Sequence, residues 1–230
     1  VEQFQNLKNI IGFVPQQDII YENLTLRRML YYTAKMKMPK DTKKEEIRQR
    51  IEEVLGMVDL KEHQDTYIRK LSGGQKKRAS IAVELLADPK LFFLDEPTSG
   101  LDPGTEKNLM QTLNSLAKEQ NKTIIMVTHT TQNLHLCDKV IFMGPGGRLC
   151  FCGNVDAAKA FYETDDLVNI YNMIAEAPWL WEKRFAEFGK VHKGAEAETK
   201  KAELGKVRKE PALRQFLILL RRYAELMKND

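Results

Sequence analysis

LSGGQ at residues 71–75 opens the most informative segment of this chain, and LFFLDEP at 91–97 and SGLD at 99–102 complete it. Apolar residues recur at helical spacing after the two glycines, so we expect a helix whose capped N-terminus is open to close backbone approach. Such a helix end favours anions. The helix dipole disfavours the three cations at 76–78, so either an anion or acidic partner lies before them or they form a solvated basic turn.

The second motif predicts a strand that ends in two carboxylates. Residues 91–94 are wholly apolar, which is typical of a central parallel strand covered on both faces. Because an unpaired charge is costly to bury, Asp95 and Glu96 should lie at the carboxyl end, where open α/β sheets bind ligands. Mg²⁺ would suit Asp95, and Glu96 could orient or deprotonate a water that attacks a phosphate. The alternative is a helix N-cap region without chemistry.

In this order and spacing, the three motifs resemble the nucleotide-binding domain of ATP-binding cassette (ABC) proteins. Residues 71–75 match that family's signature without a change, residues 91–96 match its Walker B strand, and residues 99–102 match its D-loop. The resemblance covers roughly residues 10 to 165. It implies an α/β fold of the ABC-type P-loop NTPase class, with ATP and Mg²⁺ as ligands.

Two further residues carry the resemblance outside these motifs. A predicted strand at 9–14 stops at a proline, and Gln16 after it resembles the Q-loop glutamine, which in the family helps to hold Mg²⁺ and couples the nucleotide to a helical subdomain. A second buried strand is predicted at 123–127, and His129 after it resembles the H-loop histidine. Taken alone, a loop glutamine or a lone histidine is more often structural.

The resemblance assigns roles residue by residue. Glu96 and His129 would be catalytic, and Asp95 and Gln16 would hold Mg²⁺. The other nucleotide contacts would come from Leu71, Ser72, Gly73, Gly74, Gln75, Ser99 and Asp102. In the family two such domains dimerise head to tail, and the signature of one domain completes the γ-phosphate site of the other.

For the domain organisation, we expect an ABC ATPase domain over 1–176 that lacks its N-terminal part and contains a helical subdomain at about 20–88. A charged linker would follow at 177–211. The basic, amphipathic segment 212–230 resembles the membrane-interface helix that precedes an absent transmembrane domain, the alternative being an ordinary surface helix.

The resemblance of residues 153–162 to one ABC subfamily and the lack of a phosphate loop both suggest a fragment of a longer transporter. GNVDAAKAFY at 153–162 resembles the white-type half-transporters and their bacterial relatives, in which ATPase and membrane helices share one polypeptide. No G-x-x-x-x-G-K-[ST] phosphate loop occurs in the sequence. We therefore expect a fragment that has no appreciable ATPase activity alone.

The composition restricts the kinds of binding partner that we expect for the chain. The 230 residues, 43% of them apolar, suffice for one α/β core with an appendage. The three cysteines have no metal-site spacing, and there is no signal peptide and no apolar run of the roughly 18 residues that a span needs. The net charge of +4 and the basic C-terminal region favour an anionic membrane surface, although nucleic acid would give the same signal.

We therefore expect the ATPase domain of a membrane transporter, an exporter by analogy, at the cytoplasmic face of the cell membrane, with no nucleic-acid partner. One alternative is a non-hydrolysing regulatory module, against which the intact Glu96 and His129 count. The other is a soluble ABC ATPase that acts on nucleic acid or ribosomes. The short segment between Gln16 and Ser72 and the apolar helix face near the C-terminus count against it.

Overall fold

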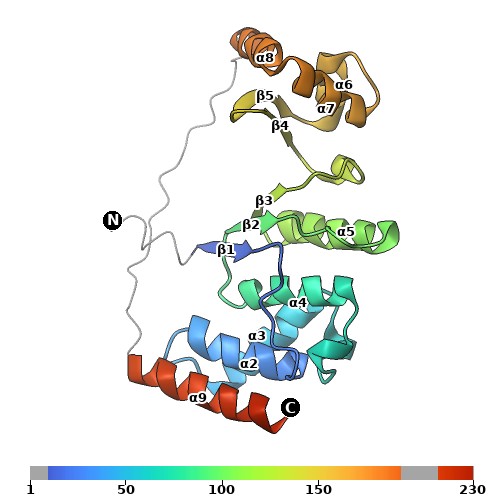
Figure 1. Cartoon of the computed structure of the whole chain (residues 1–230). Coiled ribbons are helices and arrows are strands. Elements are labelled where there is room, and N and C mark those ends of the chain that lie inside the picture. The colour runs from blue at the N-terminus through green and yellow to red at the C-terminus, as the bar shows by residue number, and fades with distance from the viewer. Residues whose placement is uncertain (1–9, 193–211, 230) are drawn as a thin grey trace. The chain divides into compact units, whose positions relative to one another are not determined.

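The computed structural model describes residues 10–192 and 212–229, which divide into two compact units (Figure 1). The first unit runs to His129 and includes the C-terminal helix, and the second begins at Thr130. The elements of the first unit are β1 (Ile11–Val14), α2 (Leu26–Lys37), α3 (Lys44–Met57), η1 (Lys61–His63), η2 (Ile68–Lys70), α4 (Gly73–Leu85), β2 (Leu91–Asp95), α5 (Pro103–Glu119), β3 (Thr123–Val127) and α9 (Ala212–Lys228).

The described strands of the first unit form one parallel sheet in the order β1-β2-β3. Helices α4 and α5 pack against it, and Phe92 and Leu94 are buried on that face. On the opposite face Phe13, Ile125 and Val127 are 54%, 43% and 61% exposed. The expectation of strands covered on both faces is therefore wrong for this unit, because no described element of the unit lies over that second face.

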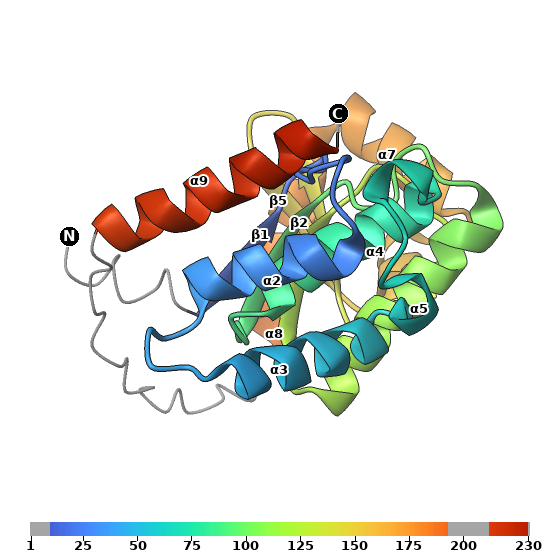
Figure 2. The same cartoon turned by 90° about the horizontal axis from the view of Figure 1, so that it is seen from below.

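Between β1 and β2 the chain forms the helices expected there. Thr25 caps α2 by accepting a hydrogen bond from the Arg28 amide, and the leucines and isoleucines of α2, α3 and α4 are buried. Figure 2 shows α9 lying alongside α2 in this same unit. The helical part thus has its own core.

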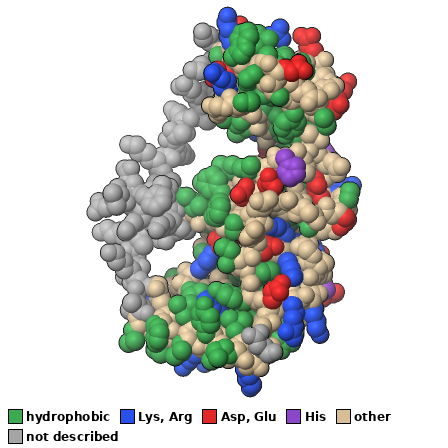
Figure 3. Space-filling view, viewed as in Figure 1, with side chains coloured by type: hydrophobic (Ala, Val, Ile, Leu, Met, Phe, Trp, Pro, Cys, Tyr) green, Lys and Arg blue, Asp and Glu red, His purple; other side chains and the backbone are tan. Residues whose placement is uncertain are grey.

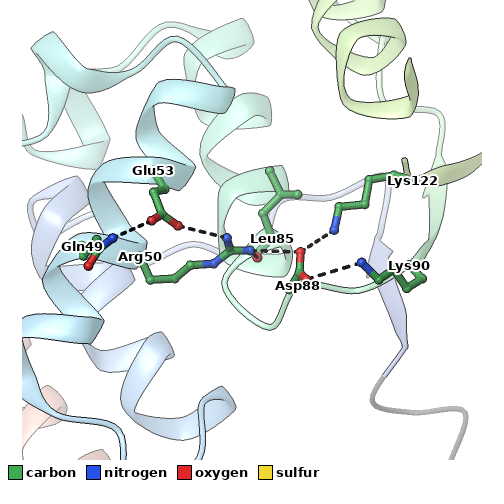
Figure 4. A network of polar contacts seen from close by, with 7 residues as sticks. All are labelled: Gln49, Arg50, Glu53, Leu85, Asp88, Lys90 and Lys122. Atoms are coloured by element: carbon green, nitrogen blue, oxygen red, sulfur yellow. Dashed lines mark hydrogen bonds and ion pairs between the residues drawn. The ribbon is translucent and has the colours of Figure 1, made fainter. Parts of the chain in front are cut away.

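An ionic network joins this helical part to the amino ends of two strands (Figure 4). Asp88 precedes β2 and accepts a hydrogen bond from Lys122, whose side chain is only 2% exposed. Arg50 of α3 lies 3.4 Å from the same carboxylate and donates to the Leu85 carbonyl at 2.6 Å. Burial acts to raise the pKa of Asp88, but the hydrogen bond and positive charge of Lys122 outweigh it and hold the pKa below its usual value.

Replacing Asp88 by asparagine is expected to lower the free energy of unfolding at pH 7 by about 1 kcal/mol, since the carboxylate is half exposed and partly screened. Asparagine tolerates the left-handed backbone at this position, where φ is 51°. Because the folded pKa lies below the reference value of 3.8, the stabilisation is present above that pH and is lost as the pH falls through the folded pKa.

Urea unfolding at pH 7 and pH 3 tests this expectation, and the difference between the two proteins should shrink at the lower pH. Asp65→Asn is the matched control, because its carboxylate is 77% exposed and lies 3.5 Å from Arg27. Equal stability of wild type and Asp88→Asn at pH 7 would contradict the structural role of the network.

The second unit is built on an antiparallel hairpin. Its elements are η3 (Leu134–Leu136), β4 (Val140–Gly144), β5 (Arg148–Gly153), α6 (Val155–Tyr162), α7 (Leu167–Glu176) and α8 (Pro178–His192). Aromatic rings dominate its core, and Tyr162 donates a hydrogen bond to the Cys150 carbonyl at 3.2 Å. All three cysteines are free, and burial raises the pKa of the Cys137 and Cys150 thiols.

Helix α8 corrects the expected linker boundary. The linker was expected from residue 177, but α8 begins at Pro178 and buries Trp181 in the core of the second unit, where the indole donates to the Met173 carbonyl at 3.0 Å. Phe185 packs against the same core. The rest of the expected linker, residues 193–211, lies outside the described residues.

Helix α9 packs on the first unit through polar contacts. Glu225 accepts hydrogen bonds from Arg28 and from the Tyr32 hydroxyl, the latter at 2.6 Å, and the bond from Arg28 holds the pKa of Glu225 below its usual value. Arg222 is buried and stacks on the Tyr21 ring, with 4.1 Å to the centroid. Ile218 is the buried apolar residue of this helix among its described side chains.

The outer face of α9 is apolar and exposed. It consists of Leu213, Phe216, Leu217, Leu220, Tyr223 and Met227. Hydrophobic side chains gather over this helix in the space-filling view (Figure 3). Among the helices of the described ranges, none combines the length and apolarity that crossing a bilayer requires.

Candidate functional site

Three predicted site residues meet at the carboxyl edge of the sheet. Gln16 follows β1, Glu96 follows β2 and His129 follows β3 closely, so the parallel topology places all three at one edge. The Gln16 side-chain amide donates to Glu96 Oε2 at 3.0 Å. His129 Nδ1 lies 3.2 Å from the other carboxylate oxygen, Glu96 Oε1. We call these three residues the Glu96 site.

The backbone fixes where the Glu96 carboxylate stands. Its φ of 44° is in the left-handed region, which is uncommon for residues other than glycine. The Glu96 amide donates to the Val127 carbonyl at 2.9 Å, and the Ser99 amide donates to the Glu96 carbonyl at 3.1 Å. Glu96 is thus held between β3 and the turn that begins the D-loop.

Asp95 and Gln16 offer oxygen donors that fit Mg²⁺. Asp95 is the last residue of β2 and is partly buried, and within the described residues its carboxylate has no hydrogen-bond or ion-pair partner. No group of three or more His, Cys, Asp or Glu side chains in the described part of the chain could hold a metal alone. Mg²⁺ takes one or two protein oxygens and fills its octahedron with water and phosphate, so the Asp95 carboxylate and the Gln16 side-chain oxygen are donors of the kind it uses.

The signature residues form the capped start of α4. Ser72 Oγ accepts from the Gln75 amide at 3.3 Å, and Gln75 Oε1 accepts from the Ser72 amide at 2.9 Å. Gln75 Nε2 lies 2.8 Å from His63 Nε2, and Leu71 is buried. The side chains of Leu71 and Gln75 therefore support the loop in this structure, and their nucleotide contacts stay predictions.

The cations that follow the signature have acidic partners inside the same unit. Lys76 Nζ lies 2.7 Å from Glu22, and Arg78 lies 3.5 Å from Asp59. Lys77 lies 3.1 Å from Asp18. These cations therefore face acidic partners, and the chain itself supplies those partners. Sequence reasoning missed Asp18 and Glu22, although both stand in the loop that starts at Gln16.

The D-loop ends in the cap of α5. Asp102 Oδ1 accepts from the Gly104 and Thr105 amides, both at 3.1 Å, and the Thr105 hydroxyl donates to Asp102 Oδ2 at 2.6 Å. The hydrogen bond from that hydroxyl is the largest of several that lower the pKa of Asp102. Since the carboxylate serves as a helix cap here, its contact with nucleotide stays a prediction.

The signature and the D-loop lie against each other. A Cβ placed on Gly74 would stand 2.2 Å from Thr105 Cγ2, and one placed on Gly73 would stand 3.6 Å from Leu101. Nothing in the sequence pattern marked Thr105 as a contact of the signature. Among the predicted residues, Gln16, Glu96 and His129 thus form the Glu96 site, and the signature residues and Asp102 form a second group at the capped starts of α4 and α5, while Asp95 ends β2.

Sequence comparison finds ABC proteins. The ABC transporter family model matches residues 2–99. The ABC transporter ATP-binding/permease protein Rv1747 of Mycobacterium tuberculosis is 37% identical over 229 residues, which are 99% of this chain and 26% of that protein. ABC transporter G family member 28 of Arabidopsis thaliana is 35% identical over 175 residues, which are 73% of this chain and 16% of that protein. The chain spans about a quarter or less of the length of these curated relatives.

Two solved structures resemble the chain at 31% identity. One is cbiO1 from Clostridium perfringens, part of the ABC transporter complex cbiONQ, with a TM-score of 0.60 over 73% of this chain and 68% of that one. The other is the ATP-binding cassette MJ0796 in a dimeric post-hydrolysis state bound to ADP and Pi, with a TM-score of 0.52 over 60% of this chain and 61% of that one. The unchanged signature, the carboxylates at the end of β2 and these relatives lead to one conclusion. The chain belongs to the ABC transporter family, as one of its ATP-binding domains.

Proposed function

We propose that this domain hydrolyses ATP to drive a substrate across a membrane, in the direction of export, at the cytoplasmic face of the cell membrane. The observation that carries the proposal is the Glu96 carboxylate held between Gln16 and His129 at the edge where open α/β sheets bind ligands. The names of the relatives, an ATP-binding/permease protein and a G family transporter, support it.

In the proposed reaction a water molecule attacks the γ-phosphate in line with the leaving oxygen. Glu96 orients this water and accepts its proton, and His129, within hydrogen-bonding distance of Glu96, holds the water and the phosphate oxygens. Asp95 and Gln16 would hold Mg²⁺, which supplies positive charge against the phosphate oxygens when bound. The protein's contribution is mainly position and electrostatics.

We further propose that two copies of the domain act as a head-to-tail pair. Ser72, Gly73 and Gly74 of one copy would complete the γ-phosphate site of the other, with Ser99 and Asp102 of the D-loop beside them. Ser72 and Gly73 are exposed at the start of α4, which suits an anionic ligand from outside the domain, whereas Gly74 is buried against Thr105 in this structure. The dimeric state of the MJ0796 cassette with ADP and Pi supports the pairing of two copies.

The phosphate loop would come from elsewhere. The 230-residue sequence has no G-x-x-x-x-G-K-[ST] segment, and the mycobacterial relative is about four times longer. We propose that the chain is part of a longer transporter polypeptide, which we call the parent protein, and that the chain alone is inactive. The test compares phosphate release from Mg-ATP by both. ATP turnover by the parent protein but not by the isolated chain agrees with the proposal. Turnover by the isolated chain contradicts the proposal that this chain is inactive by itself.

The C-terminal helix is proposed to lie in the membrane interface. Its charged groups Arg222 and Glu225 face the first unit, whereas its apolar residues face outward. An ordinary surface helix turns its apolar stripe inward. The outer face of α9, with the exposed Arg221 and Lys228 on the helix, therefore suits the boundary between headgroups and acyl chains.

Replacing Phe216 and Leu220 together by glutamate is expected to weaken binding of the chain to anionic lipid vesicles by about 100-fold or more, because each apolar side chain buried in the membrane contributes about 1.5 to 3 kcal/mol. Both side chains are more than half exposed in the structure, so the fold should tolerate the change. Co-sedimentation with vesicles measures the binding.

Gln215→Glu serves as the control, since it adds negative charge at an exposed position of the same helix. Equal vesicle binding by wild type and the double variant would make α9 an ordinary surface helix of the domain.

A further inference from the structure

Lys77 is buried, although it lies on the helix that begins with the exposed signature. Its side chain is 6% exposed, whereas that of its neighbour Lys76 is 26% exposed. A buried ammonium group is stable only when its hydrogen bonds and charge are matched. The groups that match it indicate what Lys77 does.

Within the described residues, the partners of Lys77 belong to the loop that starts at Gln16. Lys77 Nζ donates to the Gln16 carbonyl at 2.8 Å and lies 3.1 Å from Asp18 Oδ1. The Ser80 hydroxyl, one turn further along α4, donates to the same Asp18 oxygen at 2.7 Å. Lys76 adds an outer ion pair to Glu22. Residues 16–22 are thereby fastened to the first turns of α4.

Gln16 connects this fastening to the Glu96 site. Its backbone carbonyl accepts the hydrogen bond from Lys77, while its side-chain amide donates to Glu96 at 3.0 Å. A continuous series of hydrogen bonds therefore runs from Glu96 through Gln16 to Lys77 of α4. Lys77 lies one turn and a half beyond Ser72, which caps the same helix.

We infer that Lys77 is a positioning residue that couples two ATP sites, and this inference rests on the proposed ATPase function and head-to-tail pairing. In that pairing Gln16 and Glu96 act on the nucleotide bound by their own domain, and Ser72 acts on the nucleotide bound by the partner. Lys77 fastens the Gln16 loop to the helix that begins at Ser72, so the loop and the signature move together. A displacement of Gln16 at one ATP site therefore moves the signature at the other site.

The experiment uses the parent protein in lipid nanodiscs with the variants Lys77→Met and Lys76→Met. Methionine keeps the length of the side chain and removes its charge, and Lys76→Met makes the same change at the exposed neighbour. Hydrogen exchange of the amides at 17–23 is measured without nucleotide. ATP hydrolysis is measured against ATP concentration, which yields kcat, KM and the Hill coefficient.

For Lys77→Met we expect exchange at 17–23 to rise about 10-fold or more, kcat to fall about 10-fold and the Hill coefficient to fall toward 1. Lys76→Met removes only the outer ion pair to Glu22, so it should resemble wild type in kcat and the Hill coefficient and should raise exchange at 17–23 less than Lys77→Met does. Lys77→Arg, which keeps a cation, should restore part of the Hill coefficient. Asp18→Asn should change the three quantities in the same direction as Lys77→Met. It replaces Lys77→Met in the experiment if Lys77→Met fails to fold.

Several results would overturn the inference. One is a Hill coefficient and kcat of Lys77→Met equal to wild type, and another is a loss of thermal stability with unchanged kinetics, which would make Lys77 merely structural. A Hill coefficient of 1 in wild type would mean that no coupling exists. Absence of ATP hydrolysis by wild type would instead overturn the proposed function, while the exchange measurement would still report whether Lys77 fastens the loop.

Discussion

Replacing Glu96 by glutamine is expected to lower kcat for ATP hydrolysis by the parent protein by about 100-fold to 10,000-fold, the range that a positioned general base contributes. Glutamine has the same shape and can still accept the hydrogen bond that Gln16 donates to Glu96. It cannot take a proton from water at neutral pH. Nucleotide affinity should change little, because the substitution removes an interaction made mainly in the transition state.

Steady-state phosphate release and equilibrium binding of a fluorescent ATP analogue separate the two effects. Glu119→Gln is the control, since Glu119 is exposed at the end of α5. His129→Ala should also lower kcat, and the double variant should lose less than the product of the two effects, because both side chains act through one contact at 3.2 Å. Full activity of Glu96→Gln would mean that another group activates the water.

Replacing Gly74 by alanine is expected to lower the free energy of unfolding of the chain by about 1 to 3 kcal/mol, the usual cost of overpacking. The new methyl group would stand 2.2 Å from Thr105 Cγ2. Thr105 cannot turn away freely, because its hydroxyl donates to Asp102 at 2.6 Å. Either α4 shifts away from α5 or the cap of α5 breaks. A substitution in the signature would therefore disturb the start of α5, which directly follows the D-loop.

Gly73→Ala provides the matched comparison one residue earlier. Its methyl group would meet Leu101 at 3.6 Å, which is an ordinary van der Waals contact. Alanine is also favoured over glycine in a helix by about 1 kcal/mol. Urea unfolding should therefore leave Gly73→Ala at or above the stability of wild type. Equal stability of the two variants would show that the starts of α4 and α5 are free to separate.

The convergence of Gln16, Glu96 and His129 could be predicted because it depends on topology alone. Each follows an apolar run, and parallel strands bring their carboxyl ends to one edge. The left-handed backbone of Glu96 could not be predicted, because local preferences disfavour it and only the surrounding hydrogen bonds maintain it. The same limit applies to Lys77, whose partners in the folded chain lie about 60 residues away.

The boundary of the second unit and the covering of the sheet were harder to predict for different reasons. Lys and Glu residues dilute the apolar spacing of Trp181 and Phe185, so α8 resembled a solvated linker. An apolar strand such as Leu91–Asp95 does not reveal whether one or both of its faces are covered. The exposed Phe13 and Val127 show that an apolar pattern indicates which residues favour burial but does not reveal which element, if any, covers them.

Helix α9 has one further consequence, which concerns its response to electrolytes. Its attachment to the first unit includes the Arg28–Glu225 ion pair and the stacking of Arg222 over Tyr21 beside the buried Ile218, whereas its outer face is largely apolar. Added salt screens partly exposed ion pairs, and salting-out anions such as sulfate strengthen apolar association. Ionic strength is therefore expected to act on these contacts in opposite directions: concentrated sulfate should weaken the contribution of the Arg28–Glu225 ion pair while strengthening the association of the outer face with an apolar surface.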